Sequence, residues 1–290
     1  MSKPDELAAG VYPNLSFQLY LQLKAGSKHD LDMVSRSPAH LVWSKQHPQK
    51  VTPAMNLGSA AHAWILEPDD APNQVYVMPH DINRRTKAGR AEYEEAVARA
   101  GDRVVVTASE AVALQGMAEA VHKNKAAHEL LSQGQAETSL LWKDTETGLM
   151  CRGRPDWYRQ DGIVIDLKTC QDARRDAFSK SVATYRYHVQ AAFYLHLLVS
   201  LGEIPADTSS FAFIACEKAP PYGVAVYELD AEDIERGARE FRADLNRYAE
   251  VQNQIAAGDV EKCQSYPETI LSLSLPAWAR NQIDAKYPHE

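Results

Sequence analysis

The residues of this sequence whose types and spacing could perform chemistry lie in its middle third. Asp156 closes the motif Gly-Arg-Pro-Asp, while Asp166 and Lys168 belong to the motif Ile-Asp-Leu-Lys. Because side chains alternate along a strand, Asp166 and Lys168 share one face, and Leu167 points the other way into a core. The Asp-Gly pair at 161–162 favours a hairpin turn that would bring Asp156 back beside Asp166.

Two carboxylates held so close repel each other unless a proton or a cation lies between them. Hard divalent cations prefer carboxylate oxygens as ligands. Lys168 could orient or deprotonate a water molecule, or stabilise negative charge on a phosphate. Because phosphodiester hydrolysis uses a metal ion, an activated water and a nearby cation, the motif indicates a metal-dependent phosphodiesterase. A surface hairpin with an Asp–Lys salt bridge is the alternative that this motif alone leaves open.

Four further residues could belong to the same site. His62 lies in the pattern Gly-x-x-x-His on an expected helix over 56–67. Gln190 and Tyr194 are four residues apart, so a helix would place them on one face. Glu137 opens the strand expected just before the hairpin. Each of these residues has an ordinary structural explanation by itself, so only their combination supports a functional site.

Hydrophobic periodicity and turn residues predict the elements that position these side chains. Helices are expected at 14–24, 36–46, 56–67, 88–100, 107–131, 172–182, 185–201 and 231–256. Strands are expected at 74–78, 104–106, 136–142, 149–158, 163–169, 210–216 and 222–229. This order indicates a mixed α/β fold around one sheet. We expect a single domain over 1–290, with a catalytic core at about 55–230 and a helical N-terminal elaboration.

Composition narrows the class of protein. The 290 residues are 45% hydrophobic and 24% charged, as in an ordinary soluble globular protein. No apolar run reaches the ~18 residues of a membrane span, and the start lacks an apolar signal segment, so we expect a cytoplasmic protein with no membrane partner. The net charge of −8 argues against a protein that coats nucleic acid with its whole surface, but a local basic groove can bind phosphates on an acidic protein.

Several other kinds of site find no support. The cysteines show no C-x-x-C spacing, which favours reduced thiols over a zinc or iron–sulfur site. They are Cys151, Cys170, Cys216 and Cys263. The sequence has no G-x-S-x-G, H-E-x-x-H or G-x-x-x-x-G-K-[ST] motif, so an unrelated hydrolase and an ATP-driven motor are both disfavoured.

In combination, the motifs around His62, Glu137, Asp156, Asp166–Lys168 and Gln190–Tyr194 resemble the RecB-like branch of the PD-(D/E)XK nucleases over roughly 55–200. Three further stretches are similar to RecE-type phage and prophage exonucleases, also called exodeoxyribonuclease VIII. They are Ser-Arg-Ser-Pro-Ala-His-Leu at 35–41, Asn-Arg-Arg-Thr-Lys-Ala-Gly at 83–89 and Leu-Pro-Ala-Trp-Ala at 275–279. The resemblance implies a restriction-endonuclease-like core, in which a central mixed sheet is flanked by helices.

The resemblance also implies roles for the site residues. His62, Asp156, Asp166 and the Leu167 carbonyl would bind Mg²⁺, with Mn²⁺ as a substitute, and Lys168 would be the catalytic lysine. Gln190 and Tyr194 would orient the site or contact the DNA strand. Glu137 would be a supporting acid or a ligand of another metal ion. Many members of the superfamily have Glu where this sequence has Asp166, but both acids bind the same ions. Neither an iron–sulfur cluster, which some RecB-like relatives carry, nor ATP is expected.

Basic and hydroxyl side chains offer candidate contacts to DNA. Arg84, Arg85 and Lys87 precede an expected helix, whose N-terminus favours a phosphate. Arg152 and Arg154 flank the acidic motif and could contact the scissile phosphate or its neighbour. Ser35 and Ser37 could capture a terminal 5′ phosphate, although a simple helix cap before Pro38 explains them as well. The DNA backbone could also be followed by Arg174, Arg175 and Lys180.

By resemblance, the protein would degrade linear double-stranded DNA from its 5′ ends and leave 3′ single-stranded tails for recombination. RecE-type and lambda-type enzymes form closed rings, which implies a processive homo-oligomer of three or four subunits in a bacterial or phage-infected cell. A single-strand annealing protein would be its partner. Two alternatives stay open: a RecB-like endonuclease or single-strand exonuclease in DNA repair, and a DNA-end binding protein whose nuclease site is dead.

Overall fold

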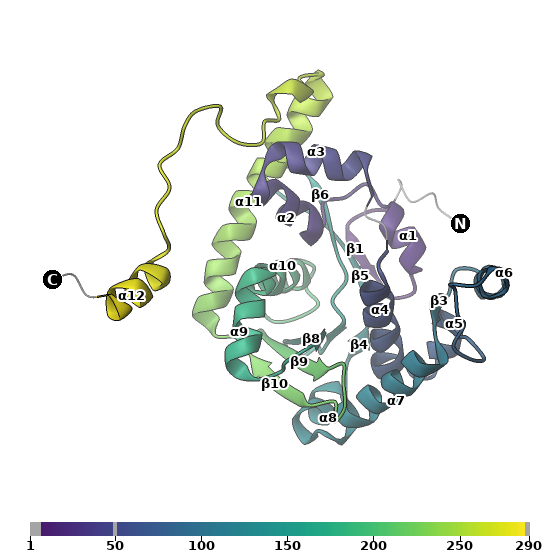
Figure 1. The fold of residues 1–290 in the computed structure, drawn as a ribbon. Coiled ribbons are helices and arrows are strands. Elements are labelled where there is room, and N and C mark those ends of the chain that lie inside the picture. Colours follow the sequence, from purple (N-terminus) through teal and green to yellow (C-terminus); the bar gives the residue numbers. More distant parts are fainter. Residues whose placement is uncertain (1–6, 49–50, 288–290) are drawn as a thin grey trace.

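The computed structural model describes residues 7–48 and 51–287, whose arrangement Figure 1 shows. The helices are α1 (Phe17–Gln22), α2 (Lys28–Arg36), α3 (Pro38–Gln46), α4 (Pro53–Leu66), α5 (Ala71–Gln74), α6 (Lys87–Ala100), α7 (Ala108–Lys123), α8 (Lys125–Leu131), α9 (Arg175–Thr184), α10 (Tyr187–Ser200), α11 (Ala231–Ala257) and α12 (Ala277–Lys286), with a 3-10 turn at Val260–Lys262. The strands are β1 (Gly10–Tyr12), β2 (Val75–Val77), β3 (Val104–Val106), β4 (Gln135–Ala136), β5 (Ser139–Lys143), β6 (Met150–Gly153), β7 (Trp157–Tyr158), β8 (Ile163–Cys170), β9 (Ser210–Glu217) and β10 (Val224–Glu228).

The largest sheet has the strand order β10-β9-β8-β7-β4. β8 and β9 run parallel, whereas the other neighbours are antiparallel, so this sheet is mixed, as the sequence predicts. Parallel neighbours need a long crossover, and here α9 and α10 supply it. The central strands are therefore fixed by both local hairpin pairing and a helical connection, which gives the site residues on β8 a rigid base.

Both faces of this sheet are covered by helices. Val164 of β8 packs in a hydrophobic cluster with residues of α10 and α11. Ile165 and Leu167 belong to a second cluster, which contains residues of α4 and α7. Alternation along β8 therefore turns Asp166 and Lys168 toward the α10 face, and it buries Leu167 completely on the other face, at 0% exposure. Both features agree with the sequence analysis.

Two strands predicted as continuous are each broken. The prediction of one strand over 136–142 is wrong, because Glu137 has a φ of +44°, which is incompatible with a strand. The prediction of one strand over 149–158 is wrong in the same way. There Pro155, which has no N–H to donate to a ladder, lies in the break between β6 and β7.

Each break carries the chain from one sheet to another. β5 and β6 pair in a separate sheet of order β1-β5-β6, while β4 and β7 pair in the large sheet. The two breaks lie side by side, since the Glu137 N–H donates to the Asp156 carbonyl at 3.0 Å. The acidic side chains of Glu137 and Asp156 therefore start from the junction of the two sheets.

Some helix predictions also need correction. The helix predicted over 107–131 divides at Asn124, whose backbone is extended. The Asn124 side chain accepts the Ala127 N–H and donates to the Val224 carbonyl, so it caps α8 and ties it to β10. The helix predicted over 14–24 shrinks to α1. Neither α2 nor α12 was predicted, and α12 follows an exposed extended stretch that leaves the body (Figure 1). In the described part of the chain, no helix is long and apolar enough to cross a membrane.

Candidate active site

Three side chains meet at the junction of the two sheets. His62 Nδ1 lies 3.5 Å from Glu137 Oε1 and 3.5 Å from Asp156 Oδ1. One ligand atom from each of these residues falls within 4.8 Å of the other two. The three residues come from α4, the β4–β5 break and the β6–β7 break, so the cluster is formed by tertiary structure alone.

The position of His62 follows from the sequence of α4. Thr52 caps this helix by accepting the Met55 N–H, and Pro53 occupies its first turn. The small residues Ala60 and Ala61 are fully buried, which lets the helix pack closely against α7 and β8. His62 follows them directly, and its side chain remains 24% exposed. The imidazole is thus held at the rim of the core, where an ion or a solvent molecule could reach it.

Asp156 lies opposite Asp166, as the hairpin predicts. Trp157 pairs with Ile165, so the next positions along the two chains are Asp156 and Asp166. Asp156 Oδ2 also accepts the Leu167 N–H at 2.8 Å. Because the N–H and C=O of one strand residue point to the same edge, the Leu167 carbonyl is directed to the side on which Asp156 lies. The Leu167 carbonyl and the Asp156 carboxylate therefore lie on the same side of β8.

Asp166 is buried and contacted by two neighbours. Gln190 Nε2 donates to Asp166 Oδ1 at 2.8 Å. Lys168 Nζ forms an ion pair with Asp166 Oδ2 and lies 4.7 Å from the centre of the Tyr187 ring. Each oxygen of Asp166 thus faces a donor or a cation. The structure groups Glu137, rather than Asp166, most tightly with His62 and Asp156.

Tyr194 lies one helical turn beyond Gln190. A Cβ placed on Gly153 would come within 3.2 Å of the Tyr194 ring, so the missing side chain at Gly153 leaves room for it. Burial, together with the Tyr20 hydroxyl and the charges of Asp156 and Asp166, raises the pKa of Tyr194 well above its ordinary value. Tyr194 is therefore a neutral phenol beside the acidic pair.

The acidic pair strongly perturbs the protonation of its neighbours. Burial, reinforced by the Asp166 charge, raises the pKa of Asp156 to about 7. Burial alone would lower the pKa of His62, but the charge of Asp156 and the contact with Glu137 raise it to about 9. Burial would likewise lower the pKa of Lys168, but Asp166 and Asp156 outweigh it and raise that pKa. A cationic His62 and a cationic Lys168 therefore balance the carboxylates.

These residues fit a divalent cation. Burial and the neighbouring Asp166 charge raise the pKa of Asp156, and a cation bound among the three side chains would oppose both effects. Two carboxylates and one imidazole are a donor set that Mn²⁺ accepts, and their oxygen content also suits Mg²⁺.

Arg152 and Arg154, predicted to contact phosphate, bind groups of the N-terminal segment. The Arg152 guanidinium donates to the Tyr20 and Leu23 carbonyls. Arg154 donates to Glu137 Oε2 at 2.9 Å, to the Leu15 carbonyl at 3.0 Å and to Ser139 Oγ at 2.6 Å. These contacts fix the β5–β6 sheet and hold Glu137 in place. A phosphate contact from either arginine stays a prediction.

The other predicted DNA contacts lie away from the cluster. Arg84, Arg85 and Lys87 are exposed at the start of α6, at the periphery of the molecule (Figure 1). Ser37 is 5% exposed and caps α3, and its Oγ lies 2.6 Å from His40 Nδ1. Ser35 is half-buried in α2. Of the residues considered as backbone contacts, Arg174 pairs with Asp172 at 2.6 Å, and Arg175 and Lys180 are exposed on α9.

Sequence reasoning missed three residues beside the site. Tyr187 lies over the Lys168 ammonium, and Arg186 precedes it with a φ of +53°. Lys28 lies near enough to Lys168 that the two charges repel, which together with burial lowers the pKa of Lys28. Tyr187 could have been found by its spacing, because it lies three residues before Gln190 on the same helix. No local signal identifies Arg186 or Lys28.

Comparisons with known proteins give the fold a family. Residues 27–269 match a family model described as a PDDEXK-like domain of unknown function (DUF3799). A crystal structure from Eubacterium rectale, described as a "Putative exonuclease", aligns with a TM-score of 0.58 at 11% identity over 95% of this chain and 99% of that chain, which supports the same fold. A second solved structure, SSO0001, aligns over 79% of this chain and 86% of that chain at 13% identity, but its TM-score of 0.27 is too low to indicate a shared fold. No curated protein matches the sequence.

Proposed function

Since the chain belongs to the family of PDDEXK-like domains, we propose that it is a metal-dependent exodeoxyribonuclease that acts on the ends of linear double-stranded DNA. One observation carries the proposal: Asp156 and Asp166 lie opposite each other at the junction of the two sheets, with the Lys168 ammonium on Asp166 and His62 beside Asp156. These are the residue types that phosphodiester hydrolysis uses, in one place and on a rigid sheet.

His62, Asp156 and Glu137 would hold the ion, with Asp166 and the Leu167 carbonyl as further oxygen ligands. When bound, Mg²⁺ would polarise the phosphate and lower the pKa of a water molecule. The Leu167 N–H keeps Asp156 Oδ2 in a fixed orientation, and Arg154 does the same for Glu137. The chain thus contributes a ligand set whose carboxylates cannot rotate freely.

Lys168 and Gln190 would act on the reacting groups. The Lys168 ammonium would stabilise negative charge on the phosphate or orient the attacking water, while its contact with Asp166 keeps it at the site. Gln190 fixes the Asp166 carboxylate by donating to Oδ1. Tyr194, which remains a neutral phenol, would donate a hydrogen bond to the DNA strand or to a water molecule.

The RecE-type details extend this proposal. We propose 5′ to 3′ polarity, processive action by a ring of three or four subunits, and 3′ tails passed to a single-strand annealing protein. Support comes from the motif series around the site and from the three RecE-like stretches at 35–41, 83–89 and 275–279. Mg²⁺ is the proposed ion, with Mn²⁺ as a substitute, because carboxylate oxygens dominate the ligand set.

The test is digestion of linear duplex DNA labelled at its 5′ or its 3′ end, with Mg²⁺, with Mn²⁺ and with EDTA. A closed circular duplex, a single strand and a duplex with 5′-hydroxyl ends serve as matched substrates. We expect metal-dependent loss of the 5′ label, an intact circle, and slower digestion of the 5′-hydroxyl duplex.

Other outcomes would change the assignment. Cutting of the circle would make the protein an endonuclease, and preference for the single strand would make it a single-strand exonuclease. A folded protein that cleaves none of these substrates with either ion would be a DNA-end binding protein with a dead site.

A further inference from the structure

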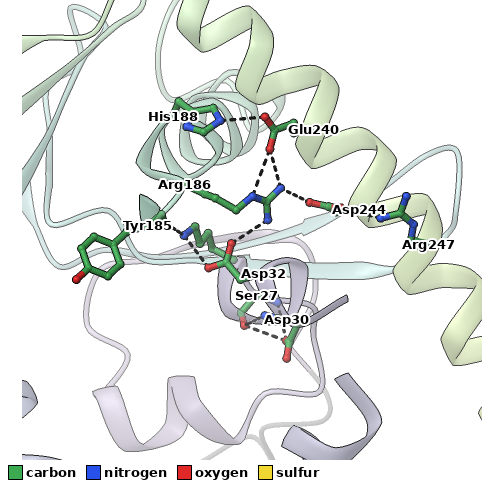
Figure 2. A network of polar contacts seen from close by, with 10 residues as sticks. Ser27, Asp30, Asp32, Tyr185, Arg186, His188, Glu240, Asp244 and Arg247 are labelled. Atoms are coloured by element: carbon green, nitrogen blue, oxygen red, sulfur yellow. Dashed lines mark hydrogen bonds and ion pairs between the residues drawn. The ribbon is translucent and has the colours of Figure 1, made fainter. Parts of the chain in front are cut away.

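Arg186 lies at the centre of a group of ion pairs between three helices (Figure 2). Its guanidinium donates to Asp32 on α2 at 3.0 Å, and to Glu240 and Asp244 on α11 at 3.0 Å and 2.5 Å. Asp244 is only 3% exposed. One side chain from the start of α10 therefore connects α10 with α2 and α11, two of the helices that pack against it.

Each of the three carboxylates also contacts a second basic side chain. Asp32 pairs with Lys28 at 2.7 Å, Glu240 with His188 at 3.1 Å, and Asp244 with Arg247 at 3.6 Å. We call these residues the Arg186 network: Asp32, Glu240, Asp244, Lys28, His188, Arg247 and Arg186 itself. A carboxylate held between two basic side chains has little freedom to rotate, so the network holds Arg186 in a fixed position.

The backbone of Arg186 is as constrained as its side chain. Arg186 adopts φ +53° and ψ +44°, a left-handed conformation that few residues other than glycine accept. Its carbonyl accepts the Gln190 N–H at 3.2 Å, which begins the hydrogen bonding of α10. The preceding carbonyl, that of Tyr185, accepts Lys28 Nζ at 2.8 Å. The network therefore fixes both the direction and the rotation of the first turn of α10.

That first turn carries two contacts to the candidate active site. Tyr187 covers the Lys168 ammonium, and Gln190 donates to Asp166. Two hydrogen bonds connect Arg186 to Asp166. The Gln190 N–H donates to the Arg186 carbonyl, and the Gln190 side chain donates to the Asp166 carboxylate.

We propose that Arg186 is a positioning residue of the nuclease site, which acts through Gln190 and Tyr187 to hold Asp166 and Lys168 in their working geometry. This inference rests on the proposed nuclease function, but the second of its two tests needs no DNA cleavage. It predicts that loss of the guanidinium loosens the first turn of α10 and lowers turnover, while DNA binding changes little.

The variant for this test is Arg186→Gly, because glycine keeps the left-handed backbone and removes only the side chain. Arg242→Ala is the matched control. Arg242 also lies on the α11 surface of the core and contacts a buried carboxylate, Asp144, at 3.0 Å, with side-chain exposures of 26% and 0% for the pair. The Arg242→Ala substitution removes an ion pair that is buried to a similar extent as the pair of Arg186 with Asp244, and it does not alter the first turn of α10. Arg186→Lys, which retains charge but cannot bridge several carboxylates, should be intermediate.

The first measurement is a double-mutant cycle on single-turnover cleavage. Arg186→Gly should slow cleavage about 10-fold or more in the natural background, because small misplacements of catalytic groups have large effects on rate. In a Gln190→Ala background the same change should slow cleavage by a clearly smaller factor, because the path through Gln190 is lost and only the contact of Tyr187 with Lys168 remains. Equal factors in the two backgrounds, or no effect in the first, would overturn the proposal.

The second measurement needs no cleavage. Hydrogen exchange of the metal-free protein, followed by mass spectrometry, should show faster exchange at 187–194 in Arg186→Gly and unchanged exchange there in Arg242→Ala. Unchanged protection in both variants would refute the positioning role. If the natural protein cleaves no DNA, the proposed function fails, and this exchange experiment still decides whether Arg186 orders the start of α10.

Discussion

Asp156 Oδ2 accepts the main-chain N–H of Leu167 at 2.8 Å, so the Asp156 carboxylate is hydrogen-bonded to β8 at the residue between Asp166 and Lys168. This single bond fixes the separation of Asp156 from Asp166 and Lys168. It also holds the Asp156 side chain, although Asp156 lies in the break between β6 and β7. The acidic pair depends on a hydrogen bond from β8 as much as on the hairpin turn.

Lys168→Ala should abolish cleavage while leaving DNA binding nearly intact. The ammonium is the cation beside Asp166, and a positioned group of this kind contributes about 10²–10⁴-fold to rate. Cleavage is measured with Mg²⁺, and binding by fluorescence anisotropy with Ca²⁺ in its place. Lys143→Ala, at the exposed end of β5, is the control and should cleave normally. Turnover like that of the natural protein in Lys168→Ala would remove Lys168 from the mechanism.

Asp156→Asn should weaken metal binding by about 10-fold or more, because the amide lacks the charge that a divalent ion requires. The asparagine oxygen can still accept the Leu167 N–H, so the fold should survive. Calorimetric titration with Mn²⁺ gives the affinity. Asp161→Asn, at the exposed tip of the same hairpin, provides the comparison and should bind Mn²⁺ normally. An unchanged affinity in Asp156→Asn would count against its assignment as a ligand.

Metal affinity should rise with pH. Without an ion, the pKa of Asp156 is raised to about 7 and that of His62 to about 9, so at neutral pH protons occupy positions that a metal ion needs. Both groups bind a metal only when deprotonated, and raising the pH removes the competing protons. Titrations with Mn²⁺ between about pH 6 and pH 8 should show this trend. His62→Gln should flatten it, and a pH-independent affinity in the natural protein would refute the ligand assignment.

Two glycines of the motif series should respond in opposite ways to alanine. A Cβ on Gly153 would lie 2.9 Å from Leu197 Cδ2, in a packed core, so Gly153→Ala should destabilise the fold by about 1–3 kcal/mol. Gly58 has nothing within 4 Å of the same position and lies within α4, so Gly58→Ala should stabilise it by about 0.5–1 kcal/mol. Urea denaturation of both variants measures the difference. A stabilising Gly153→Ala would show that Tyr194 and Leu197 are loosely packed.

Local sequence rules predicted the part of the site that lies on β8. Alternation alone places Asp166 and Lys168 on one face, and the Asp-Gly turn at 161–162 places Asp156 opposite them. Gly162 indeed has a φ of +106°. The fold class was predictable for the same reason, since periodicity and turn residues depend on near neighbours.

The junction of the two sheets was not predictable in this way. At this junction β1 pairs with β5, for example Gly10 with Leu141. No local sequence pattern predicts a pairing between strands so far apart in the chain. Glu137 and Arg186 both adopt a left-handed backbone conformation. The sequence does not predict this conformation at either residue, because glycine is its usual marker. The contact from Arg186 to Asp32 spans 154 residues, so only the folded chain reveals it.

The three-segment origin of the His62–Glu137–Asp156 cluster has a thermodynamic consequence. These side chains are separated in an unfolded chain and meet only when α4 and both sheets are in place, so an ion that binds the cluster binds the native state alone. By mass action, a metal concentration about 100 times the dissociation constant would add about 2.7 kcal/mol to the free energy of unfolding. The melting temperature of this protein would then rise with the concentration of the cation in its surroundings.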